Sequence, residues 1–192
     1  MKKRFQGRVW KFGDHIDTDV ITPGKYENLP FNELCRHCLE PLNPAFAGRI
    51  RENDVLVAGI NFGCGSAREI APRALQRLGV GAVVAKSFSR TFFRNAVTIG
   101  LPVLISPAAY DVCRDEDRVS VDLIRSRLKN LTTRQLIPVE PIPEDIYAIL
   151  LNGGLFASLR KKPNRKTGIS NRQAAVPRES RSKKIRRSGG RG

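Results

Sequence analysis

The middle of the chain alternates short apolar runs with amphipathic segments. Asp54–Ile60, Val80–Ala85 and Leu101–Ile105 are the apolar runs, and each is short enough to be a buried strand. Ile70–Leu78 and Ser87–Ile99 lie between them and place their apolar residues at helical spacing. This order predicts parallel strands joined by right-handed crossovers, with helices covering the sheet.

The two ends of the chain add weaker signals of the same kind. Gly7–Phe12 and Arg118–Leu123 alternate apolar and polar residues, which predicts two further strands. Leu136–Val139 is a weaker strand candidate, whereas Phe31–Leu39 and Glu144–Leu151 have the pattern of short helices. The fold class that follows is α/β with a mainly parallel central sheet.

A glycine-rich loop, Asn61–Glu69, separates the first of these buried strands from its helix. Gly63 and Gly65 allow a tight turn that brings backbone N–H groups close to a ligand. We expect Ser66 at the entrance of the helix and Arg68 in its first turn. Helix N-termini attract anions, so the loop predicts a site for a carboxylate or a phosphate.

Three other interpretations of this loop were compared. A dinucleotide-binding fingerprint requires a third glycine where the chain has Arg68. A hydrolase nucleophile elbow requires glycines at the positions of Cys64 and Arg68, so it is excluded. The third interpretation stays open: Ser66 could only cap the helix, with Glu69 completing a capping box.

A second polar segment, residues 14–22, contains three aspartates within six residues. The spacing lacks the glycine and the distal glutamate of a calcium loop. Local Asx-turn chemistry is the simpler explanation for Asp17 and Asp19, and His15 is one of only two histidines in the chain.

The net charge of +16 is unevenly distributed along the 192 residues. Residues 160–192 contain 13 Lys or Arg and one acid, Glu179, a net charge of +12, so residues 1–159 carry only +4. We expect one folded domain over residues 1–159 and a disordered basic tail over residues 160–192. Nucleic-acid binding, if it occurs, would be confined to this tail and driven by phosphate contacts.

The four cysteines do not form a recognisable metal motif. Cys35 and Cys38 are spaced as Cys-x-x-Cys, but no second pair faces them, and Cys64 and Cys113 stand alone. Reduced cysteines predict a cytoplasmic protein. The chain has no apolar run of membrane-spanning length and no signal-peptide pattern at its start, so we expect no membrane partner.

Three ordered motifs resemble the small subunit of 3-isopropylmalate dehydratase, the separate-chain form of the aconitase swivel domain. They are Asp17–Tyr26, Asn61–Glu69 and Ala85–Asn95, and the ending Ile149–Leu155 is similar too. The likeness covers about residues 5–160. It implies a three-layer swivelling β/β/α domain that works with a large catalytic subunit, and that subunit carries a [4Fe–4S] cluster on its own cysteines. No metal ligand is expected in this chain.

The resemblance also implies a reaction, the reversible dehydration of a small malate-type hydroxy-diacid in leucine biosynthesis. Ser66 would be the base that removes a proton from carbon, and Asp19 would lie beside it as a second catalytic residue. The implied substrate-binding residues are Arg68, Gly65, Ala67, Thr18 and Tyr26.

Departures from the family pattern bear on the substrate. Ala67 stands where a serine is usual, Ile70 replaces a histidine, and Tyr26-Glu27-Asn28 replaces Tyr-Leu-Arg. Substrates of homoaconitase, methylmalate or dimethylmalate dehydratases therefore stay open beside 3-isopropylmalate. A second alternative is a non-catalytic swivel protein whose basic tail binds nucleic acid.

Overall fold

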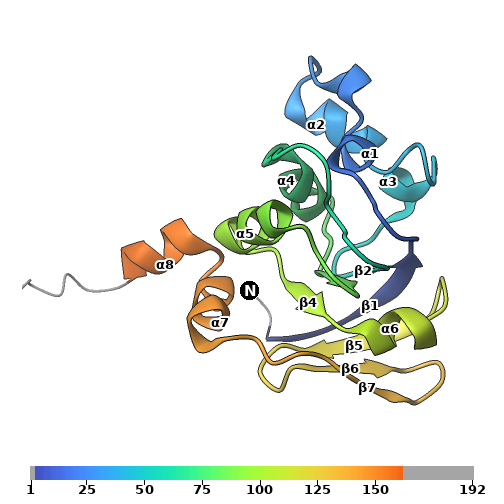
Figure 1. Cartoon of the computed structure of the whole chain (residues 1–192), viewed down its shortest axis with the longest axis vertical. Helices are drawn as coiled ribbons and strands as arrows, with labels where there is room; N and C mark the ends of the chain where they lie inside the picture. The colour runs from blue at the N-terminus through green and yellow to red at the C-terminus, as the bar shows by residue number, and fades with distance from the viewer. Residues whose placement is uncertain (1–2, 162–192) are drawn as a thin grey trace, which may run out of the picture.

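A seven-stranded sheet forms the centre of the molecule, seen in a computed structural model that describes residues 3–161 (Figure 1). The strands lie in the order β4-β3-β2-β1-β5-β6-β7. Their bounds are β1 Arg4–Lys11, β2 Val55–Ala58, β3 Ala82–Ala85, β4 Val103–Ile105, β5 Arg118–Asp122, β6 Arg127–Asn130 and β7 Leu136–Pro138. From residue 162 onward, the predicted tail lies outside the described residues.

The strands β1 to β4 pair in parallel, which the sequence predicted for β2, β3 and β4. Val9 is in register with Val55, Leu56 with Val83, and Val84 with Leu104. Every residue of β2 and β3 is buried, because the parallel strands are covered on both faces. The apolar runs that identified these strands therefore have a direct structural cause.

The other half of the sheet is an antiparallel ladder. β5 pairs with β1, and β6 and β7 continue the ladder. Sequence analysis predicted β5 and β7 but missed β6, because its outward positions are Arg127 and Lys129 and its second inward residue is polar. That residue, Asn130, is buried and donates through Nδ2 to the Asp117 carboxylate at 2.7 Å.

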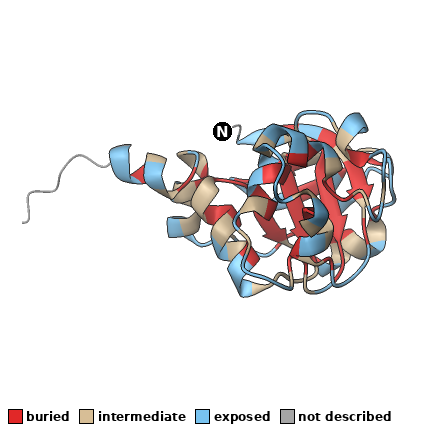
Figure 2. Ribbon diagram, turned by 90° about the horizontal axis from the view of Figure 1, so that it is seen from above, coloured by how far each residue is buried: buried red, intermediate tan, exposed pale blue. Residues whose placement is uncertain are grey.

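Two apolar cores separate three layers, the arrangement expected of a β/β/α domain. One core lies between the parallel strands and the helices and contains Trp10, Phe62 and Phe92. The other contains Val84 and Val121 and packs the opposite face of the parallel strands against the antiparallel ladder. Buried residues follow the strands in Figure 2, and the outer faces of the helices are exposed.

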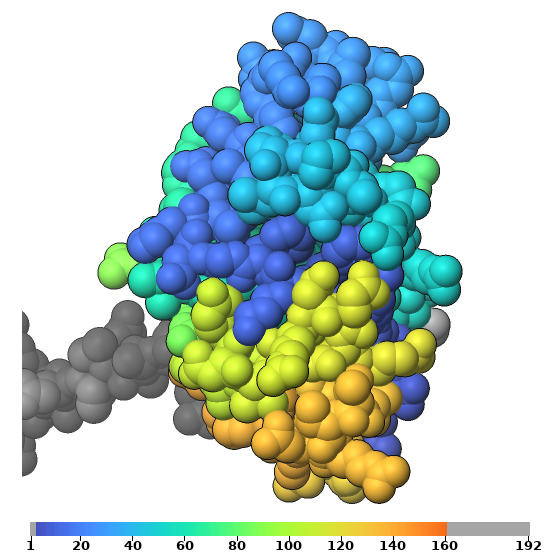
Figure 3. Space-filling view, turned by 90° about the vertical axis from the view of Figure 1, so that its right-hand side faces the viewer, coloured from blue at the N-terminus to red at the C-terminus, as the bar shows by residue number. Residues whose placement is uncertain are grey.

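Short helices complete the fold. They are α1 Thr18–Ile21, η1 Gly24–Tyr26, α2 Phe31–Leu34, η2 Cys35–His37, α3 Phe46–Arg49, α4 Ile70–Arg77, α5 Arg90–Ile99, α6 Pro107–Val112, α7 Glu144–Leu151 and α8 Leu155–Lys161. The segment containing α1 to α3 forms one end of the molecule and β5 to β7 form the other (Figure 3). None of the helices within residues 3–161 is both long and apolar enough to cross a membrane.

The helix predicted over Phe31–Leu39 is broken in the structure. It ends at Leu34, a single 3-10 turn follows, and Leu39 takes a positive φ of 55°. Cys35, Cys38 and Leu39 are nevertheless all buried in the helix-side core.

Candidate active site

The two polar segments that the sequence singled out lie side by side at the carboxyl ends of β1 and β2. Thr18 N–H donates to the Cys64 carbonyl at 2.9 Å, and Gly63 N–H donates to the Ile16 carbonyl at 2.8 Å. These bonds extend the parallel pairing of the two strands into their loops. In open α/β sheets, ligands bind at the carboxyl ends of the parallel strands.

Gly63 and Gly65 are required by close packing between the two loops and α5. Both have positive φ, 74° and 84°. A Cβ on Gly65 would lie 2.2 Å from an Asp17 carboxylate oxygen, and one on Gly63 would lie 2.2 Å from the ring of Phe92. The prediction of a tight glycine turn is confirmed, and the close neighbours within this chain are Asp17 and Phe92.

Ser66 lies in the loop before α4, so the expectation that it enters the helix is wrong. The helix begins at Ile70 after Glu69, and the Glu69 side chain makes no capping bond. The capping-box interpretation is therefore wrong too. The exposed Ser66 Oγ instead lies 3.3 Å from Thr18 Oγ1 and donates to Asp19 Oδ1 at 3.5 Å.

Arg68 joins this group from the same loop. Its Nε lies 3.1 Å from Asp19 Oδ1, and one terminal nitrogen lies 3.7 Å from Glu27 Oε2. The guanidinium passes over Gly24, where an added Cβ would lie 3.8 Å from it. Arg68 is thus held by two carboxylates while its side chain stays 30% exposed, which leaves part of the guanidinium open to a substrate carboxylate.

Tyr26 has a different set of partners from the other predicted site residues. Its hydroxyl donates to Glu40 Oε1 at 3.0 Å, and its ring stacks on His37 with centroids 3.7 Å apart. Hydrogen bonds from Tyr26 and His37 hold the pKa of Glu40 below its usual range. Tyr26 thus anchors the turn that carries Glu27 toward Arg68, and sequence reasoning had no signal for this cluster.

The remaining predicted residues have clear places. Thr18 is buried at the start of α1, where the Asp17 carboxylate accepts from Asp19 N–H at 2.8 Å, so the predicted Asx turn is confirmed. Ala67 is exposed beside Ser66, whereas Ile70 packs against the helix-side core. Ser66, Asp19, Arg68 and Thr18 therefore form one cluster.

The described residues of this chain do not fit an iron–sulfur cluster. Among residues 3–161, no group of three Cys, His, Asp or Glu side chains could hold a metal ion. Cys35, Cys38 and Cys113 are buried in the two cores. Burial and the charge of Asp17 raise the pKa of the Cys64 thiol, which opposes the thiolate form that iron requires.

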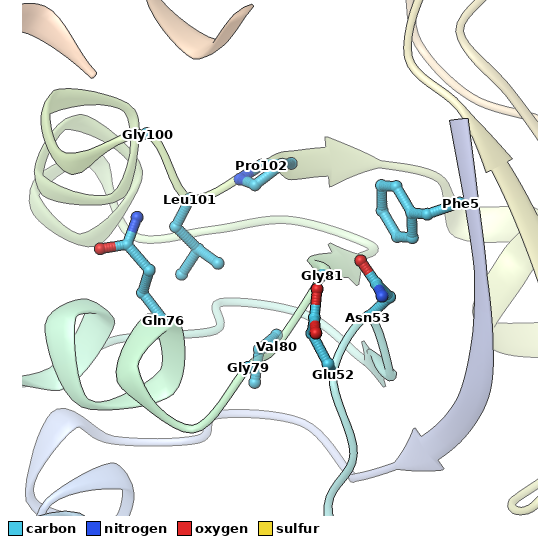
Figure 4. A pocket seen from close by; sticks show the side chains of 10 residues that line it. All are labelled: Phe5, Glu52, Asn53, Gln76, Gly79, Val80, Gly81, Gly100, Leu101 and Pro102. Atoms are coloured by element: carbon cyan, nitrogen blue, oxygen red, sulfur yellow. The ribbon is translucent and has the colours of Figure 1, made fainter. Parts of the chain in front are cut away.

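A separate cavity of about 300 Å³ opens at the opposite, amino ends of the parallel strands (Figure 4). Residues that precede β2, β3 and β4 line it, including Asn53, Gly81 and Pro102, with Phe5 of β1. It lies at the amino ends of the strands, so it is not part of the Ser66 cluster.

Comparisons with known proteins agree with the geometry. Residues 42–108 match the aconitase C-terminal domain family. The chain is 45% identical to the 3-isopropylmalate dehydratase small subunit of Heliobacterium modesticaldum, an alignment that covers 82% of this chain and 96% of that protein. It is 44% identical to the methanogen homoaconitase small subunit of Methanothermobacter thermautotrophicus, with 88% and 98% covered.

A solved structure shows the same fold. The crystal structure of 3-isopropylmalate dehydratase (leuD) from Methanocaldococcus jannaschii matches with a TM-score of 0.77 and 40% identity, over 82% of this chain and 94% of that one. Sequence motifs, the β/β/α layers and these relatives agree, and the chain therefore belongs to the 3-isopropylmalate dehydratase small-subunit family of aconitase-type hydro-lyases.

Proposed function

We propose that this chain supplies the Ser66 base and the Arg68 carboxylate clamp of a two-subunit hydro-lyase. The observation that supports this most directly is the meeting of Ser66, Asp19 and Arg68 at the carboxyl edge of the parallel strands. Ser66 and Arg68 come from one loop, and Ser66 is 47 residues from Asp19 in the sequence, so their meeting is a property of the fold.

The chemistry of the group fits proton removal from carbon. The Ser66 hydroxyl passes its proton to the Asp19 carboxylate, and Ser66 Oγ takes the proton from the carbon next to the carboxylate that Arg68 binds. Asp19 accepts the hydrogen bond of the Ser66 hydroxyl, and Arg68 balances the charge of Asp19 at 3.1 Å. Negative charge then builds on the bound carboxylate, where the guanidinium stabilises it.

The other half of the site belongs to a large subunit. A [4Fe–4S] cluster on that subunit would supply a Lewis acid for the departing hydroxyl. The described residues of this chain offer no ligand set for it, so its contribution is the base, the carboxylate clamp and the surface that meets the large subunit.

The substrate we propose is 3-isopropylmalate, a dicarboxylate with an apolar side chain. Glu27 supports this choice over the tricarboxylate of a homoaconitase, because its carboxylate already faces Arg68 at 3.7 Å and would repel a third carboxylate. The setting would be cytoplasmic leucine biosynthesis. Methylmalate-type and dimethylmalate-type diacids fit the same charge pattern.

The test is reconstitution with a candidate large subunit under anaerobic conditions, with iron and sulfide. A panel of hydroxy-diacids and homocitrate is assayed by the ultraviolet absorbance of the unsaturated product. Ser66→Ala should lower kcat at least about 1000-fold while the complex still forms. Ser120→Ala on β5, away from the site, is the control and should keep full activity. Full activity in Ser66→Ala would refute the assignment.

The basic segment supports a separate proposal of nucleic-acid binding. It contains 13 Lys or Arg over residues 160–192 and no aromatic residue, so binding would depend on phosphate charge alone. Deletion of residues 162–192 should abolish DNA binding without changing turnover. A DNA affinity that does not fall as salt is added would contradict the proposal.

A further inference from the structure

A second hollow lies on the same edge of the sheet as Ser66, beyond β3 and β4. Its volume is about 320 Å³, and it is lined by Ser87, Phe88, Arg90, Phe93, Arg94 and Ile105. These residues come from the loop after β3, the first turns of α5 and the end of β4. Because β1 to β4 are parallel, this hollow and the Ser66 cluster both lie at the carboxyl ends of these strands.

The wall of the hollow is bonded to the loop that carries Ser66. Ser87 Oγ accepts from Asn61 N–H at 2.8 Å, and the Ser87 carbonyl accepts from Phe62 N–H at 3.0 Å. The rings of Phe62 and Phe88 then meet edge to face, 6.1 Å apart. A molecule seated in the hollow would therefore be held at a fixed position relative to the catalytic loop.

Two cations at the rim lack carboxylate partners. Arg90 and Arg94 lie one turn apart on α5, both exposed, and neither forms an ion pair within residues 3–161. The nearby Lys86 is different, because Asp111 binds it at 2.7 Å. The one acid in the adjoining hollow is Glu140, which shares the walls formed by Phe93 and Ile105.

Apolar surface is exposed at the same edge. Phe88, Phe93 and Ile105 are half-buried, and Ile60, at the start of the catalytic loop, is 43% exposed. An apolar patch bordered by unpaired arginines has the composition of a protein interface. A small anion would satisfy the arginines but leave the apolar surface in water.

We propose that this hollow, with Arg90 and Arg94, is the docking surface for the large subunit, which inserts an apolar side chain flanked by carboxylates. The inference rests on the proposed function, because a site that lacks cluster ligands must be covered by the subunit that has them, and Ser87 in the wall of this hollow is hydrogen-bonded to the loop that carries Ser66. A second copy of the chain fits poorly, since it would bring the same unpaired cations together.

The experiment titrates the large subunit against the full-length chain by calorimetry at two salt concentrations. Arg90→Glu with Arg94→Glu should raise the dissociation constant at least about tenfold, and added salt should weaken the binding of the unaltered chain. At saturating large subunit, kcat should stay within about twofold, because neither arginine belongs to the catalytic cluster.

The matched control places the same charge change on the antiparallel ladder. Arg127→Glu with Lys129→Glu alters two exposed cations of β6 and should leave the dissociation constant unchanged. The milder Arg90→Gln with Arg94→Gln, checked by circular dichroism and thermal unfolding, separates lost docking from lost folding. It should still weaken binding severalfold while the melting curve is unchanged.

Three results would overturn the inference, and they differ in what they say about the proposed function. Equal affinity of the Arg90/Arg94 variant in an active complex refutes the docking surface and leaves the hydro-lyase assignment standing. The docking surface is also refuted, with the hydro-lyase assignment still standing, if the Arg90/Arg94 variant changes only the self-association of this chain in sedimentation. If the unaltered chain binds no large subunit and turns over no hydroxy-diacid, both proposals fail.

Discussion

The side chain of Thr18 spans the backbone and the side chain of Ser66. Its hydroxyl donates to the Ser66 carbonyl at 2.9 Å, and the two hydroxyl oxygens lie 3.3 Å apart. Thr18 itself is buried, so its position is fixed by packing at the start of α1. The orientation of the Asn61–Glu69 loop therefore depends on a residue 48 positions before Ser66 in the chain.

Replacing that hydroxyl by a methyl group should impair catalysis more than folding. Thr18→Val keeps the shape but loses the bond to the Ser66 carbonyl, which costs about 1 kcal/mol of unfolding free energy. Displacement of Ser66 Oγ should lower kcat by about ten- to a hundredfold. The conservative Thr18→Ser keeps the hydroxyl and should keep most activity; equal loss in both variants would contradict a role for that bond.

Glu27 should tune which acids the site accepts. Glu27→Gln removes a carboxylate 3.7 Å from the Arg68 guanidinium, so more of the positive charge becomes available to substrate. The pair is solvent-exposed, which limits the change in KM for a dicarboxylate to about two- to fivefold. KM should decrease more for a tricarboxylate such as homocitrate, because the repulsion between Glu27 and its third carboxylate also disappears.

A charge-matched variant isolates this effect from net charge. Glu33 is exposed on α2, and Glu33→Gln removes the same charge without touching Arg68. Steady-state kinetics of both variants with the two substrate types gives the ratio of kcat/KM. An unchanged ratio in Glu27→Gln, or the same shift in Glu33→Gln, would show that Glu27 does not discriminate between substrates.

The extent of sequence prediction differed between the fold and the site. β2 and β3 were predictable because burial on both faces leaves only apolar residues in them. β6 was not, because the hydrogen bond between Asn130 and Asp117 allows a polar residue at an inward position. The sheet order, with β1 between a parallel and an antiparallel neighbour, also depends on long-range pairing.

For the site, the local motif gave a wrong position for Ser66, whereas four of the residues that the resemblance named, Ser66, Asp19, Arg68 and Thr18, lie together in the structure. The Ser66–Glu69 spacing fits a capping box, but Thr18 and Asp19 engage Ser66 instead. Local secondary-structure propensity carries no information about a contact with residues nearly fifty positions away in the sequence. The stack of Tyr26 on His37, which fixes the turn before Glu27, is a tertiary contact of the same kind.

Gly65 tests how tightly the two loops must approach. Gly65→Ala places a Cβ 2.2 Å from an Asp17 oxygen at a φ of 84°, so the backbone must move. The φ alone costs at least about 1–2 kcal/mol, and kcat should be nearly lost as Ser66 shifts. Gly48→Ala in α3, where an added Cβ meets nothing within 4 Å, should be neutral or slightly stabilising by urea unfolding. Normal kcat in Gly65→Ala would show that the loop tolerates displacement.

Cys64 lies in the Asn61–Glu69 loop, and its reactivity tests whether it is a cluster ligand or a structural residue. Burial and the Asp17 charge raise the pKa of its thiol, so at pH 8 it carries less thiolate than a free cysteine does. Alkylation by iodoacetamide should therefore be slow at pH 8 and accelerate as the pH rises further. Cys64→Ser should keep the iron content and at least about half the kcat of the reconstituted complex, because the loop is held by the Cys64 backbone carbonyl at 2.9 Å from Thr18 N. Loss of iron in Cys64→Ser would place a cluster ligand in this chain and contradict the proposal that the large subunit alone holds the cluster.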